Sequence, residues 1–176
     1  MSVRMVCSVA AFVAFAALTP AAQSTAIQAD LLKDWTAMKD RMAKISDAMP
    51  EDKFAYKPTP AQRSYGEQIL HVAGANVGLM KVLGGKAAAP TIDTKATSKA
   101  AILKALADSY DYGTAVIGEL NDQSMAEVVK GPSFIGDATR ARLVWITIGH
   151  AWDEYGAMTT YLRLNGIVPP ASRGSM

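Results

Sequence analysis

Apolar side chains recur every three or four residues along four stretches of the chain, the spacing that places them on one face of an α-helix. The stretches cover about residues 25–48, 64–83, 99–120 and 137–164. In the first stretch the apolar face consists of Ile27, Leu31, Trp35, Met38, Met42, Ile45 and Met49. No segment shows the alternation of period two that marks a half-buried strand. Four amphipathic helices of this length predict an all-α four-helix bundle.

Cap residues and connectors set the boundaries of these helices. Ser64 precedes the second helix and Glu67 follows three residues later, which is the pattern of a capping box. Asp137 is a suitable N-cap for the fourth helix. The three connectors are polar or contain proline and glycine, and they cover about residues 51–62, 86–98 and 121–136. Because these connectors are long enough for crossovers, the sequence leaves the order of the helices around the bundle open.

The chain begins with the pattern of a secretory signal peptide. Residues 1–22 combine a short basic start, an apolar run and a cluster of small residues. The apolar run is shorter than the ~20 residues of a transmembrane helix. We expect cleavage between Ala21 and Ala26, export to the periplasm or the medium, and no stable membrane anchor afterwards. Residues 23–176 then form the mature bundle domain, which has lost the only cysteine, Cys7.

Composition limits the chemistry that this domain can carry. The chain has 18 Lys and Arg against 16 Asp and Glu, a net charge of +2, and therefore no electrostatic footprint for nucleic acid. A single cysteine excludes an intramolecular disulfide framework and a cysteine-rich zinc site. Only two histidines are present, so a third protein ligand of a metal would have to be a carboxylate. We expect a small molecule of unknown identity as the partner.

Both histidines lie inside predicted helices, His71 on the second and His150 on the fourth. Glu154 follows His150 by four residues, so the two side chains lie one above the other on one helical face. That face is otherwise core-like, which predicts an interior carboxylate that needs a charged partner or a metal. His71, His150 and Glu154 are therefore the candidate ligands of one divalent metal. Two imidazoles and one carboxylate suit Zn²⁺, Ni²⁺, Fe²⁺ or Mn²⁺.

The same residues allow other interpretations. Asp153 lies three residues from His150 and can replace Glu154 as the ligand or support it from outside. The two histidines and the carboxylate can also form a metal-free polar network. The sequence offers no clear second catalytic group, so the catalytic residues stay unassigned. All three tryptophans are expected to be packing residues: Trp35, Trp145 and Trp152.

Two longer strings of residues resemble the DinB-like superfamily. Residues 56–73, YKPTPAQRSYGEQILHVA, combine an extended Lys-Pro segment with an Arg-Ser helix start and a histidine. Residues 150–170, HAWDEYGAMTTYLRLNGIVPP, are similar to the last helix of that family and its exit. The resemblance covers about residues 27–173, which is nearly all of the mature chain.

The resemblance implies a four-helix bundle that holds a divalent metal through three histidines. In the family, one is on the second helix and two lie four residues apart on the fourth, which corresponds to His71, His150 and position 154. This chain has Glu154 in the third place, and the change converts the ligand set to two histidines and one carboxylate. It also has Tyr155 and Ala157 where many members have Arg and Gln.

Characterised members of the family include thiol-dependent S-transferases and a maleylpyruvate isomerase. The resemblance therefore implies a metal-dependent transferase, with hydrolysis by a metal-activated water as the general alternative, on an unknown small substrate. Two other functions compete with this prediction. One is a non-catalytic ligand-binding bundle with a metal-free His/Glu network. The other is a homodimer module, since bundles of this kind often associate through an apolar helix face.

Overall fold

A computed structural model describes residues 25–174 of the chain. The predicted signal peptide, residues 1–22, lies outside the described residues, so its cleavage and the export that it implies stay predictions. Among the described residues, no helix combines the length and the apolarity that crossing a bilayer requires.

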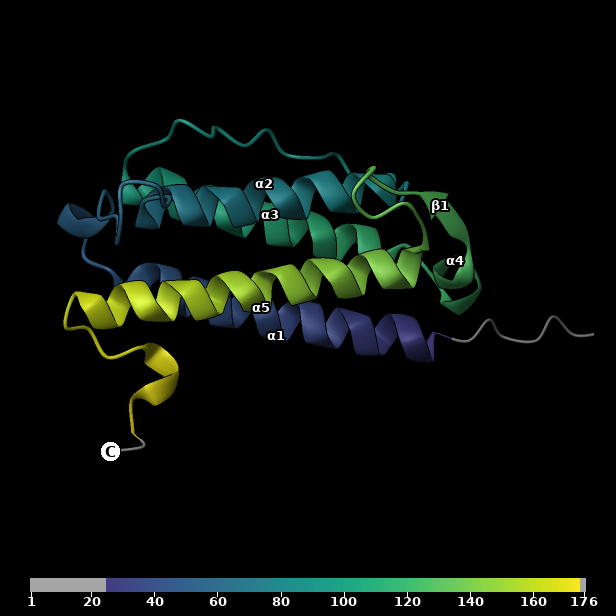
Figure 1. The fold of residues 1–176 in the computed structure, drawn as a ribbon. Helices are drawn as coiled ribbons and strands as arrows, with labels where there is room; N and C mark the ends of the chain where they lie inside the picture. Colours follow the sequence, from purple (N-terminus) through teal and green to yellow (C-terminus); the bar gives the residue numbers. More distant parts are fainter. Residues whose placement is uncertain (1–24, 175–176) are drawn as a thin grey trace, which may run out of the picture.

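Four long helices form the body of the molecule: α1 (Ala26–Ala48), α2 (Tyr65–Val82), α3 (Lys99–Gly118) and α5 (Arg140–Leu164). Each packs against two others, so the order around the bundle is α1, α3, α2, α5 (Figure 1). The consecutive helices α1 and α2 therefore lie on a diagonal. Two 3₁₀ turns, η1 and η2, cover Glu51–Lys53 and Pro170–Ser172. The prediction of four long helices is confirmed, and the fold is mostly helical.

The helices do not run in simple up-and-down order. The end of α1 lies near the start of α3, where the Lys99 ammonium donates to the Asp47 backbone oxygen at 2.7 Å. The end of α3 lies near the end of α2, where the Glu119 carboxylate accepts from the N–H of Lys86 at 2.6 Å. Thus α2 and α3 are parallel, and α1 and α5 run opposite to them (Figure 1). Residues 83–98 form the crossover, since about 50 Å of extended chain exceeds the ~27 Å length of α2.

Short elements occupy the connector that follows α3. They are α4 (Asp122–Ala126) and two antiparallel strands, β1 (Val128–Lys130) and β2 (Asp137–Thr139). The prediction of no strand is wrong here, because strands of three residues are too short to show a period of two. The predicted N-cap is also wrong: Asp137 belongs to β2, and Thr139 caps α5. The Thr139 hydroxyl accepts from the N–H of Arg142 at 3.2 Å.

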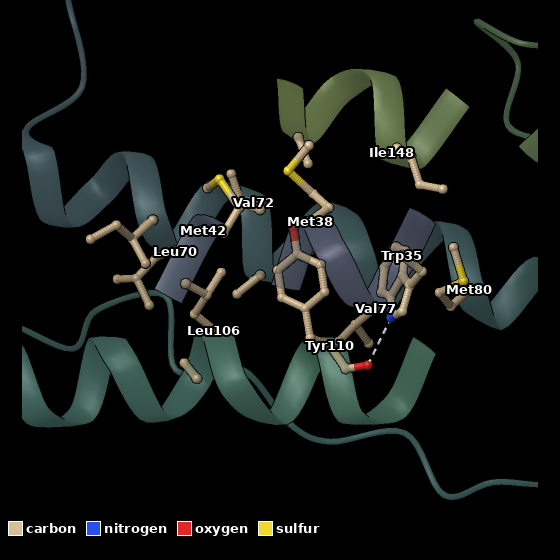
Figure 2. Close-up of a cluster of buried hydrophobic side chains, with 14 of the residues drawn as sticks. Trp35, Met38, Met42, Leu70, Val72, Val77, Met80, Leu106, Tyr110 and Ile148 are labelled. Carbon is tan, nitrogen blue, oxygen red and sulfur yellow. Dashed lines mark hydrogen bonds between the residues drawn. The ribbon is translucent and has the colours of Figure 1, made fainter. Parts of the chain in front are cut away.

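The apolar faces of the helices meet in one core that contains Trp35 of α1 (Figure 2). Trp35 is fully buried, its indole N–H donates to the Tyr110 backbone oxygen at 3.0 Å, and the two rings lie 4.8 Å apart. The predicted apolar stripe of α1 is buried from Trp35 onward, and Leu31 is half-buried. Ile27, in the first turn, is 53% exposed, so the stripe is wrong at that end.

The other two tryptophans do not pack in the core. Trp145 and Trp152 are 67% and 47% exposed on α5. The buried positions of this helix, such as Leu143 and Thr147, define its inward face, and the tryptophans lie on the opposite side. The prediction of three packing tryptophans is therefore right for Trp35 and wrong for the other two.

Candidate metal centre

The start of α2 fixes the position of His71. The Ser64 hydroxyl accepts from the N–H of Glu67 at 3.2 Å, and the Glu67 carboxylate accepts from the N–H of Ser64 at 2.6 Å, which confirms the capping box. The preceding residue is tied to α5, because the Tyr161 hydroxyl donates to the Arg63 backbone oxygen at 2.8 Å. These bonds hold the first turns of α2 against α5, and His71 lies on the side that faces that helix.

The helix α5 supplies the other two side chains. His150 is half-buried and Glu154 is 7% exposed, one turn further along the inward face. Asp153, the alternative ligand, is exposed and lies outside the cluster. The structure thus brings together His71, His150 and Glu154, and it leaves Asp153 apart from them.

The three side chains form a tight triangle of donor atoms. His71 Nε2 lies 3.0 Å from His150 Nε2, and Glu154 Oε1 lies 3.3 Å from the first nitrogen and 3.4 Å from the second. The centres of the two imidazole rings are 4.9 Å apart. The histidine side chains are 33% and 26% exposed, so part of each side chain is open to solvent.

Hydrogen bonds alone do not satisfy all three edges of this triangle. Each Nε2 carries at most one hydrogen in a neutral imidazole, and an ionised carboxylate carries none. If both nitrogens donate to Glu154, two N–H groups face each other at 3.0 Å. If one nitrogen donates to the other, the acceptor nitrogen faces the carboxylate with a lone pair. A single cation between the three atoms would use all three lone pairs at once.

The residues present fit a divalent metal. A tetrahedral ion with ligand bonds of ~2.0–2.1 Å holds its donor atoms about 3.4 Å apart, which is close to the two distances that involve Glu154. Two neutral imidazoles and one carboxylate form a common donor set for first-row divalent ions, with at least one coordination position left open. Within residues 25–174, these three residues are the one group of His, Cys, Asp or Glu whose arrangement can hold such an ion.

Burial and neighbouring charges favour the protonation states that a metal needs. Burial lowers the pKa of the His71 imidazole and Arg63 lowers it further, while Glu154 acts in the opposite direction. Burial raises the pKa of the Glu154 carboxyl, but the hydrogen bond to His150 and the charges of His150, His71 and Arg63 outweigh it. The net pKa of Glu154 is below its ordinary value. At neutral pH, His71 is therefore neutral and Glu154 ionised.

The histidine of the triangle that lies on α5 lacks a hydrogen bond to any described residue at its second ring nitrogen. His150 Nδ1 is buried and has no hydrogen-bond partner among the described residues. Metal-bound imidazoles usually donate their second N–H to an acceptor, which fixes the tautomer and the ring orientation. Without such a bond from a described residue, only packing and the contacts of Nε2 orient the His150 ring, a feature that lowers the metal affinity expected of this donor set.

A surface hollow of about 600 Å³ adjoins the triangle at His71. Its lining includes Lys57, Arg63, Glu67, Leu70 and Gly74. Gly74, three residues after His71, keeps the floor open, since a side chain there would meet no atom within 4 Å. A second hollow of about 440 Å³ shares Arg63 and reaches Ala157 and Tyr161 of α5. The two hollows therefore meet at Arg63.

Arg63 supplies positive charge to both hollows. The Lys57 ammonium lies 3.0 Å from the Glu67 carboxylate, so its charge is paired. Arg63 forms no ion pair with any residue that the structure describes. Its charge nevertheless contributes to lowering the pKa values of His71 and Glu154, which shows that it acts on the triangle.

Sequence reasoning did not single out Arg63 and Gly74 as residues that line the hollow beside His71. The signals for Arg63 were its place directly before the N-cap Ser64 and the Arg-Ser helix start of the family resemblance, and neither says anything of its distance from His71. Gly74 stood inside a regular helical pattern and had no signal. Arg63 gains its place beside α5 from a tertiary contact, since the hollow that it shares with that helix reaches Ala157 and Tyr161.

A four-helix bundle with a cluster of two histidines and one carboxylate between its second and last long helices defines the class of this protein. The sequence profile of the DinB superfamily matches residues 34–158. The chain therefore belongs to the DinB superfamily. No curated protein matches its sequence.

Two crystal structures of DinB-like proteins have a similar fold. The protein from Bacillus cereus ATCC 10987 matches with a TM-score of 0.65 and 20% identity, over 80% of this chain and 93% of that chain. The protein YjoA from Bacillus subtilis matches with a TM-score of 0.62 and 14% identity, over 78% of this chain and 92% of that chain. At these identities, the similarity extends to the fold alone.

Proposed function

We propose that this protein binds one divalent metal through His71, His150 and Glu154, and that it promotes transfer or hydrolysis of a small anionic substrate. The triangle of donor atoms carries the proposal, because hydrogen bonds cannot satisfy all three edges and the two edges to Glu154, 3.3 and 3.4 Å, suit a shared cation. Membership of the DinB superfamily supports it. Glu154 takes the place of the third histidine that the family resemblance implies, so the number of protein ligands stays at three.

The charge around the triangle indicates the class of substrate. Two neutral imidazoles and one carboxylate leave a divalent site with a net positive charge, and Arg63 adds a second positive charge beside it. A carboxylate or phosphate group on a small molecule would bind there, because a guanidinium offers two parallel N–H donors to either group. Leu70 and Gly74 would contact the rest of that molecule in the larger hollow.

The chemistry divides between the metal and the chain. When bound, a divalent metal supplies Lewis-acid activation of the group that takes its open position. Arg63 orients the anionic end of the substrate, and the hollow limits its size. Glu154 stays ionised and His71 stays neutral, so neither has to change its protonation state to bind the metal.

Export is part of the proposal, and the pattern of residues 1–22 supports it. The protein would act in the periplasm or outside the cell. Mass spectrometry of the protein isolated from its host should show a new N-terminus between Ala21 and Ala26. An intact chain that starts at Met1 would contradict export.

Metal content measured on the purified protein tests the proposal. After loading with Zn²⁺ or Ni²⁺ and removal of excess metal, elemental mass spectrometry should find one ion per chain. His71→Ala and Glu154→Gln should each lose the ion, because each leaves too few strong ligands. Asp153→Asn is the matched control: it removes the exposed carboxylate next to Glu154 and should keep the metal. Negligible metal in the wild type, or equal metal in His71→Ala, would overturn the proposal.

One observation favours a second candidate, a metal-free bundle that binds a ligand without catalysis. His150 Nδ1 has no partner among the described residues, and the distance of 3.0 Å between the two Nε2 atoms is that of a direct hydrogen bond. This candidate predicts a protein that is insensitive to metal. It also predicts that His150→Ala lowers the free energy of unfolding by about 1–3 kcal/mol, because Glu154 would lose a buried partner.

A further inference from the structure

The outward face of α5 carries a repeated pattern of tryptophan and glycine. Trp145, Gly149, Trp152 and Gly156 follow one another at spacings of four, three and four residues, which places them in one stripe along the helix. All four are exposed. Large exposed aromatic side chains that gather on one face mark interaction surfaces. The candidate metal centre lies on the opposite side of α5, so this stripe is separate from it.

The two glycines are open notches, one between the tryptophans and one after Trp152. A side chain built at Gly149 or Gly156 would meet no atom within 4 Å. The stripe therefore alternates a bulky side chain with an empty position. This is the knob-and-hole pattern by which two helices interlock at close range.

We propose that α5 pairs with α5 of a second copy of this chain, antiparallel about a two-fold axis. The axis passes midway between Gly149 and Trp152. In that register Trp152 of one copy fills the notch at Gly149 of the other, and Trp145 fills the notch at Gly156. One symmetry operation makes all four contacts, which is the condition for an isologous dimer.

The sequence along the stripe favours a second copy of this chain as the partner, and it favours the antiparallel over the parallel orientation. A parallel pair would place tryptophan against tryptophan, glycine against glycine and Arg142 against Arg142. In the antiparallel register Arg142 lies opposite Thr159, and no two like charges meet along the stripe. An unrelated partner would need a complementary series of knobs and holes, whereas a second copy has it by symmetry.

The indole of Trp152 is already held in place on the surface. The guanidinium carbon of Arg41, on α1, lies 5.2 Å from the centre of its ring, and the Tyr155 ring lies 5.8 Å away, edge to face. A side chain that is ordered before binding loses less conformational entropy when the partner arrives. Trp152 next to the axis is therefore suited to act as the anchor of the pair.

The molar mass of the purified protein in solution tests this pairing. Light scattering or sedimentation equilibrium should give twice the mass of one chain for the wild type. Gly149→Gln should give the mass of one chain at the same concentration, because the new side chain occupies the notch that Trp152 of the partner needs. Gly156→Gln is an independent second variant with the same expectation. Glutamine favours a helix over glycine, so α5 should persist, and circular dichroism checks this.

The matched control is Gly78→Gln on α2. Gly78 is also exposed, and a side chain there also meets no atom within 4 Å, so the substitution makes the same chemical change away from the stripe. This variant should keep twice the mass of one chain. The proposal fails if the wild type has the mass of one chain at its highest soluble concentration, or if both α5 variants keep the doubled mass. Neither result depends on the metal centre, so the two proposals stand or fall separately.

Discussion

At the scale of single residues, Gly113 of α3 sets the fit of the core. A Cβ atom at this position would collide with the Trp35 ring and lie 2.6 Å from its Cε2 atom. Trp35 cannot move aside freely, because it is fully buried and its N–H is bonded to the Tyr110 backbone oxygen (Figure 2). A methyl group at residue 113 therefore has to displace a ring that has no free space around it.

Gly113→Ala should lower the free energy of unfolding by about 1–3 kcal/mol, the usual penalty of overpacking. Chemical denaturation measures it. Gly78→Ala is the control, since that position is open, and it should raise the free energy by about 0.5–1 kcal/mol through helix propensity. If both variants are stabilised, the core has room that the structure does not show.

Arg63 determines, in our proposal, which molecules bind beside the metal. Arg63→Gln should weaken the binding of acetate to the Ni²⁺-loaded protein by about tenfold, because a charged hydrogen bond is lost. Isothermal titration calorimetry measures it. Lys57→Gln is the matched control and should have a smaller effect, since the Lys57 charge is already paired with Glu67 at 3.0 Å. Equal weakening by the two variants would mean that overall charge, and not Arg63, attracts the anion.

At the scale of elements, the N-terminus of α2 should respond to acid. The N–H of Ser64 donates to the Glu67 carboxylate, and this bond together with the Lys57 ammonium lowers the pKa of Glu67 below 4.5. A carboxyl group whose pKa is lowered by folding stabilises the folded protein at pH values above the pKa that the group has in the unfolded chain. That contribution disappears as the pH falls through the lower, folded value.

Glu67→Gln should therefore be less stable than the wild type at about pH 6 and nearly equal to it at about pH 3. The expected difference at the higher pH is about 0.3–1 kcal/mol, the usual effect of a negative charge at a helix N-terminus. Urea denaturation at both pH values measures it. A difference that stays the same at both pH values would show that the carboxylate charge plays no part in the cap.

The long helices could be predicted from the sequence because each signal is local. The start of α2 follows from Ser64 and Glu67, which are three residues apart, and the end of α1 from Pro50. The start of α5 could not be predicted correctly, because Asp137 and Thr139 are both good caps. The pairing of β1 with β2 decides between them. The parallel course of α2 and α3 depends on residues 83–98, whose composition does not specify a path.

The candidate site also has features that could be predicted from the sequence and features that could not. His150 and Glu154 are four residues apart on one helix, so their shared face could be predicted from the spacing. That His71 meets them could be expected because it is the other histidine of the chain and because the family resemblance places it there, but no local pattern relates α2 to α5. The smaller hollow depends on how the segment before α2 packs on α5 through Tyr161. The larger hollow depends on how that segment and Thr94 of the crossover lie beside α2, and a helical period contains no information on either.

At the scale of the whole molecule, the candidate metal centre joins elements that are distant in sequence. His71 is on α2 and Glu154 on α5, so a shared ion exists only when the bundle is assembled. A ligand that binds only the folded state raises the free energy of unfolding by RT ln(1 + [L]/Kd), which is about 2.7 kcal/mol when its concentration is 100 times Kd. For a chain of this size we expect the thermal midpoint to rise by about 5–10 °C with saturating Zn²⁺.

Thermal unfolding followed by circular dichroism, with Zn²⁺ or with EDTA, measures this stabilisation. Asp153→Asn should show the same rise as the wild type, because that exposed carboxylate lies outside the triangle. His71→Ala should show no rise, since the link between α2 and α5 is gone. A rise in His71→Ala equal to that of the wild type would place the ion elsewhere. If Zn²⁺ leaves the wild type unchanged and His71→Ala lowers its midpoint, the three residues act as a polar network, because their contact then stabilises the fold without an ion.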